Sequence, residues 1–339
     1  MAESVMEQIV TDLRANGEKY YAGRGAPRGV RVVGHTPKAD HYIYDMVIDF
    51  ADGGERIAAK VYRPNRCGPK GAHGMARQEH GNLERVYQAF QKKKLTGVPR
   101  PLGDFTELGA VVAEKFSGFP LQSLIMKAAL LPGYADGALL KAAARKTGEW
   151  LRSYHRAVAD GAASLDSSCL VEELEKLCEK CRGEGLDDNS IRTIVGGSRA
   201  ALARARKSLP CSAVLNDFTP LNVIVGEQGV GIADFAKMAP HGLSFNDVAN
   251  FLAAVEALEK YPFCNRAITG QVQGEFLDAY GISPAEMGVL RVMKMRALLS
   301  MFAQGRRGKE SAVRKKVMWA TVMKRFIQQA AERSLAPAA

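Results

Sequence analysis

The segment spanning residues 214–235 limits the possible folds of this chain more than any other part of the sequence. A polar loop within it carries Asp217 and, five residues later, Asn222. Two short apolar runs joined by a glycine-rich turn follow, and the second ends in Asp234 and Phe235. This pattern predicts a tight loop and then a β-hairpin that returns a second carboxylate to the loop's side of one cleft.

The three polar residues of this segment are of the types that phosphoryl transfer requires. One carboxylate orients and deprotonates the acceptor hydroxyl, and an amide oxygen and a second carboxylate hold Mg²⁺ against the nucleotide phosphates. Asp217 is the candidate for the first role, and Asn222 and Asp234 are candidates for the second. An Asp-x4-Asn pair alone is a common pattern, whereas its combination with the hairpin and the Asp-Phe pair is specific.

This loop and hairpin resemble those of the aminoglycoside phosphotransferase and choline kinase group, the small-molecule branch of the protein-kinase-like fold. The resemblance implies an α+β, bilobal fold with a small β-rich N-lobe and a larger helical C-lobe. It also implies transfer of a phosphoryl group from ATP, with Mg²⁺, to a hydroxyl of a small molecule or glycan. On this resemblance Asp217 is the catalytic base, and Asn222 and Asp234 are the metal ligands.

The resemblance continues toward the N-terminus. Lys60, in Ile57-Ala58-Ala59-Lys60, looks like the third-strand lysine of kinases, whose ammonium neutralises the α- and β-phosphates. Glu79 stands where the next helix of the family carries the carboxylate partner of that lysine, and Glu84 is the competing candidate. Lys60 and Glu79 are therefore expected to be cofactor-binding residues.

Three further positions resemble family features. The segment with Glu114 and Phe116 looks like the hinge between the lobes, whose backbone would bind adenine. His155 lies in a helix that resembles the family's Leu-x-x-Tyr-His segment, and we expect it to be structural. Asp247 looks like the aspartate that anchors the catalytic loop from below.

The sequence also departs from the family pattern at three points. Leu215 replaces the histidine usual in the catalytic loop, and residues 34–41 contain one glycine where kinases have a glycine-rich phosphate loop. These two departures favour an alternative, a pseudokinase that acts as a nucleotide-sensing or scaffolding module. Ala236 follows the Asp-Phe pair, and no long activation segment comes after it, which argues against a phosphorylation-switched protein kinase.

Hydrophobic periodicity divides the chain into a β-rich and a helical part. We predict residues 1–116 as an N-terminal nucleotide-binding lobe and residues 117–339 as a C-terminal catalytic and acceptor-binding lobe. The predicted strands of the first part span residues 30–34, 42–50, 56–62, 102–104 and 110–114, with a helix over 75–93. Helices over residues 142–157, 190–207 and 247–334 dominate the second part.

Positive charge is concentrated at the C-terminal end. The net charge is +11, and residues 291–339 hold twelve Lys or Arg and two Glu, so the first 290 residues carry about +1. Such a stretch repels polycationic acceptors and suits an anionic one, such as a phosphorylated sugar, an acidic glycan or a glycolipid head group. Peripheral contact with an anionic membrane surface and a simply solvated helix face are the alternatives. No nucleic-acid motif is present, so no nucleic-acid partner is expected.

The composition fits a soluble globular protein, with 47% hydrophobic and 24% charged residues. No apolar run approaches the roughly 20 residues of a membrane span, and the acidic N-terminal segment does not resemble a signal peptide, so a cytoplasmic location is expected. Cys178 and Cys181 form a CxxC pair without further ligands at zinc-site spacing, which favours ordinary thiols.

Overall fold

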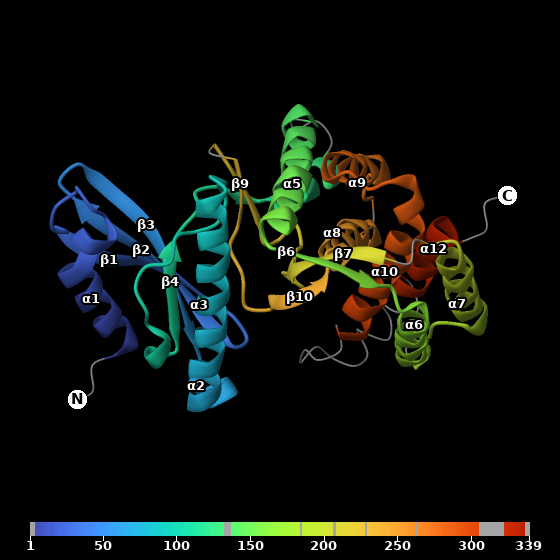
Figure 1. Cartoon of the computed structure of the whole chain (residues 1–339), viewed down its shortest axis with the longest axis horizontal. Helices are drawn as coiled ribbons and strands as arrows, with labels where there is room; N and C mark the ends of the chain where they lie inside the picture. Colours follow the sequence, from blue (N-terminus) through green and yellow to red (C-terminus); the bar gives the residue numbers. More distant parts are fainter. Residues whose placement is uncertain are drawn as a thin grey trace. The chain divides into compact units, whose positions relative to one another are not determined.

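The computed structural model describes residues 4–131, 137–183, 185–205, 208–227, 229–261, 263–304 and 322–335, and it divides into two compact units (Figure 1). Unit 1 comprises Met1–Phe119 and Ile224–Met238, and unit 2 comprises Pro120–Val223 and Ala239–Ala339. The hairpin that carries Asp234 therefore groups with residues more than a hundred positions earlier in the chain. The assignment of separate functions to residues 1–116 and 117–339 stays a prediction.

Unit 1 is built on a four-stranded antiparallel sheet with the order β1-β2-β3-β4. Its strands are β1 (Gly29–Pro37), β2 (His41–Phe50), β3 (Gly53–Tyr62) and β4 (Ala110–Glu114). The expected strand over residues 102–104 is wrong: the Leu102 amide donates to the Val112 carbonyl at 2.9 Å and Pro101 forms an isolated bridge with Ala113, but no strand is formed there. Pro101 has no N–H to donate, and Gly103 has a φ of +68°, so the segment cannot continue as a regular strand.

Two helices cover opposite faces of this sheet. Side chains alternate between the faces of a strand, so Ile57 and Ala59 of β3 point one way and Lys60 the other. Helix α1 (Val5–Tyr20) packs with Ile57 and Ala59 in one apolar cluster. Helix α3 (Pro69–Lys92) lies on the Lys60 side (Figure 1). It follows the short α2 (Pro64–Cys67) and begins six residues before the expected start, because Pro69 is well suited to the first turn of a helix.

The predicted hairpin is confirmed. It consists of β8 (Val223–Gly226) and β9 (Gly229–Ile232), and the two-residue strand β5 (Phe119–Pro120) pairs with β8. Two glycines allow this close packing. A Cβ on Gly226 would lie 2.1 Å from the Ser117 carbonyl oxygen, and a Cβ on Gly231 would lie 2.5 Å from the Phe116 ring. The chain before β5 is thereby packed directly on the hairpin.

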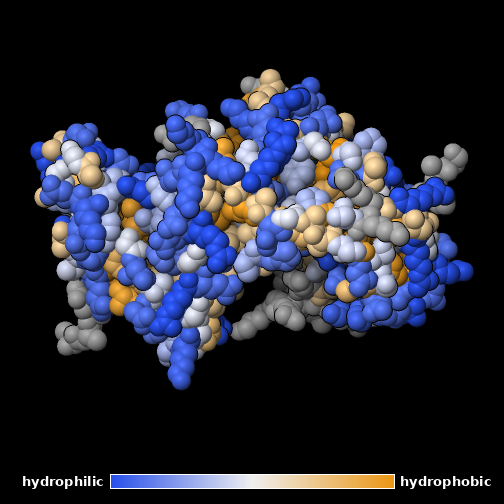
Figure 2. Space-filling model, viewed as in Figure 1, coloured by the Kyte–Doolittle hydropathy of each residue, from blue (hydrophilic) through white to orange (hydrophobic). Residues whose placement is uncertain are grey.

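Unit 2 is mainly helical, and no described helix of the chain is long and apolar enough to cross a membrane. Asp166 caps α6 (Ser167–Arg182) and Asp187 caps α7 (Asp188–Ala203), each by accepting a hydrogen bond from a backbone amide in the first turn. The outward surface over α6 and α7 is mostly hydrophilic (Figure 2). The helices are α4 (Leu121–Leu130), α5 (Gly137–Ala157), α6 (Ser167–Arg182), α7 (Asp188–Ala203), α8 (Phe245–Glu256), α9 (Arg266–Tyr280), α10 (Pro284–Gln304) and α12 (Lys324–Leu335).

A three-stranded sheet in unit 2 was not expected from the sequence. It has the order β10-β7-β6, with β6 (Ala159–Ser164), β7 (Ser208–Val214) and β10 (Ala239–Leu243). The helix expected over 190–207 accordingly ends at Ala203, and β7 begins at Ser208. Strand β6 lies at an edge of the sheet and is almost entirely exposed, so it shows no apolar alternation that could reveal it.

Helices α5 and α9 approach each other closely at Gly148. A Cβ at this position would lie 2.4 Å from the Phe276 carbonyl oxygen and 3.0 Å from the Ala279 Cβ. Both helices carry residues of the site described below, His155 on α5 and Tyr280 on α9. A glycine is therefore required where the two helices must be close.

We expect Gly148→Ala to destabilise the protein by about 1–3 kcal/mol, because the backbone of α9 must move to admit the methyl group. Gly274→Ala is the matched control, since Gly274 lies in α9 with nothing within 4 Å of an added Cβ. The control should be neutral or up to about 1 kcal/mol more stable, as alanine favours helix. Urea unfolding of both variants measures this, and equal stability would contradict the close contact.

Candidate functional site

Unit 1 brings Lys60, Glu79 and Asp234 into one cluster. The Lys60 ammonium lies 3.0 Å from Glu79 Oε1 and 3.2 Å from Asp234 Oδ1. A lysine on a strand, a glutamate on the helix covering that strand and an aspartate after the hairpin therefore share one ion pair network. Glu84, the competing candidate, is exposed and accepts a hydrogen bond from Gln88 instead.

Burial and charge act against each other in this cluster. Burial alone would lower the pKa of Lys60, but the carboxylates of Glu79 and Asp234 outweigh burial, so the pKa of Lys60 is raised. Burial would raise the pKa of Asp234, yet the attraction of Lys60 and the bond from the Ala236 amide leave that pKa lowered. Glu79 is completely enclosed, and this burial raises its pKa against the pull of Lys60. The ammonium and the Asp234 carboxylate thus stabilise each other's charged form.

Two residues support this cluster that sequence analysis did not identify. The Tyr62 hydroxyl donates to Glu79 Oε2 at 2.6 Å. The Asn82 amide donates to the carbonyl oxygens of Phe235 and Met238, at 3.0 and 3.2 Å, and so fixes the chain after Asp234 on α3. Periodicity could have revealed both, since Tyr62 is two residues after Lys60 on a strand and Asn82 is three residues after Glu79 on a helix.

The hinge-like segment lies at the end of β4. The Glu114 amide donates to the Arg100 carbonyl at 2.9 Å, so it is not available to a nucleotide base. The Glu114 side chain is paired with Arg100 at 2.8 Å. Phe116 follows outside the strand and packs its ring on Gly231 of β9. Backbone groups after Glu114, not its side chain, are therefore the candidates for adenine contact.

The turn between β1 and β2 is short and tied down, unlike a glycine-rich phosphate loop. The Lys38 amide donates to the His41 carbonyl at 2.8 Å, and Arg63 donates to the Lys38 carbonyl at 3.2 Å. Gly34 sits at an irregularity in the β1–β2 pairing. The backbone of Lys38 is therefore not available to an anion.

Unit 2 contains the loop with Asp217 and Asn222, between β7 and β8. The Asn222 side-chain nitrogen donates to the Asp217 carbonyl oxygen at 2.9 Å, and the Asn222 amide donates to Thr219 at 3.0 Å. The five-residue spacing therefore closes a compact turn. Because the nitrogen of the Asn222 amide is used within the loop, its oxygen is the atom that can bind a cation.

Asp247 holds this loop from α8. Its carboxylate is fully buried and accepts hydrogen bonds from the backbone amides of Leu215 and Asn216, both at 2.8 Å. Asn216 has a φ of +58°, a left-handed conformation that costs energy outside glycine, and these bonds stabilise it. His155 Nε2 lies 3.1 Å from Asp247, and His155 Nδ1 lies 2.8 Å from the Tyr280 hydroxyl. His155 thus orients the carboxylate that orients the loop.

The surroundings of the loop explain how Leu215 replaces a histidine. Leu215 is 2% exposed, so an apolar side chain at this position gains by burial. The next buried residue, Phe218, stacks with Trp150 at a centroid distance of 6.1 Å and contacts the ring of Phe251 at 5.7 Å. Backbone bonds to Asp247 and aromatic packing hold the loop, and a histidine side chain is not needed for this.

The basic C-terminal stretch is largely neutralised where the structure describes it. Lys294 pairs with Glu256 at 2.5 Å, and Lys324 pairs with Asp187 at 3.2 Å. Arg296 bonds Glu173. These internal pairs reduce the positive charge that was expected to face a partner. Arg291, Arg325 and Arg333 are described as well, whereas Arg306, Arg307, Lys309, Arg314, Lys315 and Lys316 lie outside the described residues.

No family model matches the sequence, and no curated protein matches it. Solved structures, in contrast, match the fold over almost the whole chain. One is an aminoglycoside phosphotransferase in a ternary complex with AMP-PNP and hygromycin B, with a TM-score of 0.52, 14% identity and coverage of 94% of this chain and 98% of the other.

Two further structures show the same relation. A choline/ethanolamine kinase family protein from Mesorhizobium loti has a TM-score of 0.51 and 15% identity, covering 97% of this chain and 99% of that one. Amicoumacin kinase in complex with AMP-PNP, Ca²⁺ and Ami has a TM-score of 0.51 and 15% identity, covering 89% of each chain. The chain therefore has the protein-kinase-like fold of small-molecule kinases, which confirms the predicted fold class and the resemblance.

Removing the central cation tests the unit 1 cluster. In Lys60→Met two carboxylates stay without their partner, so the pKa values of Glu79 and Asp234 should rise above their ordinary values near 4. A raised pKa in the folded state means that stability falls as the pH rises. We expect a loss of about 3–5 kcal/mol at pH 7 that becomes smaller toward pH 4.

Thermal unfolding of wild type and Lys60→Met between pH 4 and pH 8 measures this difference. The gap should widen as the pH rises, because in the wild type the contribution of the lowered Asp234 pKa is fully present above its ordinary value. The double variant Lys60→Met with Glu79→Gln should recover part of the loss at pH 7. A gap that does not change with pH would refute this account.

A second prediction concerns the buried carboxylate under the loop. Asp247→Asn replaces one acceptor oxygen by an NH₂ group that faces a backbone N–H, and it should cost about 1–3 kcal/mol. Asp278→Asn, an exposed aspartate on α9, should change stability by less than about 0.5 kcal/mol. Chemical denaturation of both variants checks this, and equal stability of the two would disprove the bracing role of Asp247.

Proposed function

We propose that this protein is a kinase that uses ATP and a divalent cation, Mg²⁺, to phosphorylate a hydroxyl of a small molecule or glycan. The observation that carries the proposal is the pairing of the Lys60 ammonium with both Glu79 and Asp234, in a chain with the protein-kinase-like fold. In such a site the lysine neutralises phosphate charge, and the carboxylate after the hairpin serves a metal ion.

The nucleotide would be bound by groups of unit 1. The Lys60 ammonium, held in place by Glu79, supplies the positive charge for the α- and β-phosphates. Glu114 and Phe116 supply backbone contacts for adenine, with the Phe116 amide as a donor since the Glu114 amide is engaged by Arg100. The side chains of Thr36 and Lys38 are the nearest candidates for phosphate contact at the β1–β2 turn.

The donor set fits a hard divalent cation. Asp234 keeps a lowered pKa and is therefore an anion at neutral pH, and its side chain is 31% exposed, so it can be reached. The oxygen of the Asn222 amide is oriented by the bond of its nitrogen to Asp217. Carboxylate and amide oxygens are the ligands that Mg²⁺ accepts. When bound, this ion neutralises charge on the phosphates, and Asn222 and Asp234 hold it there.

Asp217 would act on the acceptor. Its carboxylate accepts the proton of the acceptor hydroxyl as that oxygen bonds to the γ-phosphorus, and the bond from phosphorus to the bridging oxygen of ADP breaks. The compact turn with Asn222 and the backbone bonds to Asp247 hold the loop of Asp217 in one conformation before the substrate arrives. Positioning of this kind is the main contribution that such a site makes to rate.

The acceptor is proposed to be a sugar or glycolipid that carries negative charge. Support comes from the net charge of +10 over residues 291–339, obtained from twelve cations and two glutamates, which disfavours polycationic acceptors. Peripheral contact with an anionic membrane surface has less support, since Lys294, Arg296 and Lys324 are each paired within the fold. A cytoplasmic location remains part of the proposal.

A thermal-shift titration with Mg²⁺–ATP tests the nucleotide site. At about 100 times the Kd the ligand adds about 2.7 kcal/mol of stability, so the wild type should show a shift of several degrees that requires Mg²⁺. Asp234→Asn should lose most of the Mg²⁺-dependent part. Asp278→Asn should behave like wild type, because Asp278 is an exposed residue of α9 that has no part in the proposed nucleotide or metal site. The absence of any shift in the wild type would refute the proposal.

Turnover separates the proposal from the pseudokinase alternative. Asp217→Asn should retain the thermal shift with Mg²⁺–ATP but reduce ADP formation with an acceptor at least about 100-fold, the usual effect of losing a positioned acid–base group. A wild-type protein that binds Mg²⁺–ATP and forms no ADP with any hydroxyl compound would favour the alternative, a nucleotide-sensing or scaffolding module.

A further inference from the structure

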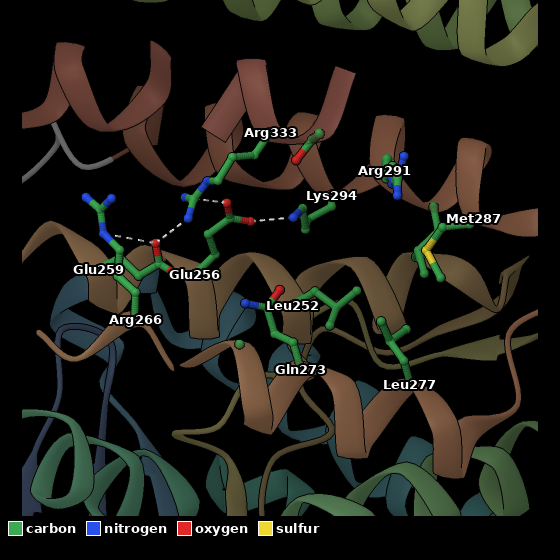
Figure 3. Close-up of a pocket in the computed structure, with 13 residues that line it drawn as sticks. Leu252, Glu256, Glu259, Arg266, Gln273, Leu277, Met287, Arg291, Lys294 and Arg333 are labelled. Atoms are coloured by element: carbon green, nitrogen blue, oxygen red, sulfur yellow. Dashed lines mark hydrogen bonds and ion pairs between the residues drawn. The ribbon is translucent and has the colours of Figure 1, made fainter. Parts of the chain in front are cut away.

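Unit 2 contains a cavity that the sequence did not reveal. It has a volume of about 300 Å³, is open to solvent, and is lined by residues of α8, α9, α10 and α12 and by Glu259 (Figure 3). This volume is at the lower end of the range for small-molecule sites. Leu252, Leu277 and Met287 form an apolar part of its wall, and charged residues form the remainder. Such a mixture is typical of a pocket that binds a polar ligand with one apolar face.

The charged part of the wall is a continuous chain of ion pairs (Figure 3). Arg333 lies between two carboxylates, 3.0 Å from Glu256 and 2.8 Å from Glu259. Lys294 pairs at 2.5 Å with Oε2 of Glu256, the oxygen that Arg333 does not contact, and Arg266 lies 3.7 Å from Glu259. Both glutamate side chains are about 4% exposed or less. Their charge is therefore compensated by cations of the protein itself.

Arg291 adds a cation to this wall that no carboxylate compensates. It lines the cavity from α10, and among the residues that the structure describes no ion pair or hydrogen bond involves its guanidinium. The lining thus holds four cations, Arg266, Arg291, Lys294 and Arg333, against the two glutamates, and four minus two leaves a net charge of +2. A ligand with negative charge would complete the compensation.

We propose that this cavity binds the anionic group of the acceptor, a carboxylate or a phosphate on a sugar, with Arg291 as the main contact. The inference rests on the proposed kinase function and specifies the acceptor class for it. Arg291 can donate two parallel hydrogen bonds to either anion, which is the geometry that a guanidinium favours. The polar side chain of Gln273 and the apolar wall are placed to contact the attached sugar.

A cationic acceptor fits this cavity poorly for a physical reason. An ammonium group could use Glu256 or Glu259 only by displacing Lys294, Arg266 or Arg333 from an existing ion pair. Displacement of Lys294, whose side chain is 14% exposed, would leave a largely buried cation without its partner, which is costly. An anion, in contrast, joins Arg291 without breaking any pair. The charge pattern therefore selects for anionic acceptors and against amino sugars.

Helix α8 connects this cavity to the catalytic loop. Asp247, in the first turn of α8, binds the backbone of the loop that carries Asp217, and Glu256 is the last residue of the same helix. A single helix is stiff over this length, so the cavity and the loop keep a constant separation. Nine residues separate Asp247 from Glu256, roughly 13.5 Å along the helix axis, so an acceptor anchored by its anion must be long enough to bring a hydroxyl to the loop of Asp217.

Calorimetric titration of the full chain with matched sugars tests the proposal. The probes are glucose 6-phosphate, glucuronate, glucose, glucosamine and inorganic phosphate. We expect the two anionic sugars to bind at least tenfold more tightly than glucose or glucosamine. The two anionic sugars also distinguish a phosphate from a carboxylate as the group preferred. Inorganic phosphate should bind more weakly than glucose 6-phosphate, and equal affinity would overturn the assignment to a sugar acceptor.

Variants of Arg291 connect any binding to this cavity. Arg291→Ala should weaken the binding of the anionic sugars at least tenfold and should keep the wild-type melting temperature, because no residue in the described part of the chain pairs with Arg291. Arg291→Glu brings the net charge of the lining to zero and should remove the preference for anionic sugars over glucosamine. Arg192→Ala, at an exposed arginine on α7, is the matched control and should bind like wild type.

Two results would overturn the proposal: no binding of either anionic sugar, or equal binding by wild type and Arg291→Ala. These results are independent of the kinase proposal, since binding is measured without ATP. Asp217→Asn should bind the anionic sugars as wild type does, while ADP formation is lost. If the wild type binds the anionic sugars but forms no ADP, the kinase proposal fails. If it forms ADP but does not bind the anionic sugars, the proposal for this cavity fails.

Discussion

The ammonium group of Lys60 is the interaction on which unit 1 depends. It connects three parts of the chain that are far apart in sequence: strand β3, helix α3 through Glu79, and the segment after β9 through Asp234. Without this cation, two carboxylates would be enclosed near each other, and burial and mutual repulsion would both oppose the fold. Tyr62 and Asn82 support the same junction by hydrogen bonds to Glu79 and to the backbone after Asp234. The lysine that we propose to bind phosphate is thus also required for the stability of this unit.

Unit 2 depends in the same way on a buried charge of opposite sign. Asp247 has no exposed surface, and its two oxygens bind the backbone of Leu215 and Asn216 and the ring of His155. The carboxylate therefore fixes a left-handed residue next to Asp217. Gly148 has no side chain, so α5 can pack closely on α9, and this packing brings His155 to Tyr280. Because His155 contacts Asp247, the position of the loop with Asp217 also depends on this glycine.

Charge in the C-terminal helices has two different uses. Most of the described cations are paired with carboxylates of the fold, as Arg333 is with Glu256 and Glu259. Composition alone counts all of them as available to a partner, which overstates the basic surface. Arg291 differs because the described residues offer it no counter-charge, and it lines a cavity. Arg291, which has no partner among the described residues, therefore supports an anionic acceptor more strongly than the net charge of the whole stretch does.

The sequence by itself determined the kinase-like fold class and the hairpin, because Asp217, Asn222 and Asp234 stand in one local segment that resembles the loop and hairpin of small-molecule kinases. It also indicated Glu79 over Glu84, since Glu79 stands at the position that the resemblance to kinases gives to the carboxylate partner of the lysine. Local patterns failed at residues 102–104, where proline and glycine prevent a strand, and at β6, an exposed edge strand without apolar alternation. Only the tertiary structure decided which cations are paired and that Tyr62 and Asn82 reach the cluster of Lys60, Glu79 and Asp234. It also decided that four helices line a cavity at Arg291. These features arise from contacts between residues distant in sequence, and such contacts depend on packing and not on local periodicity.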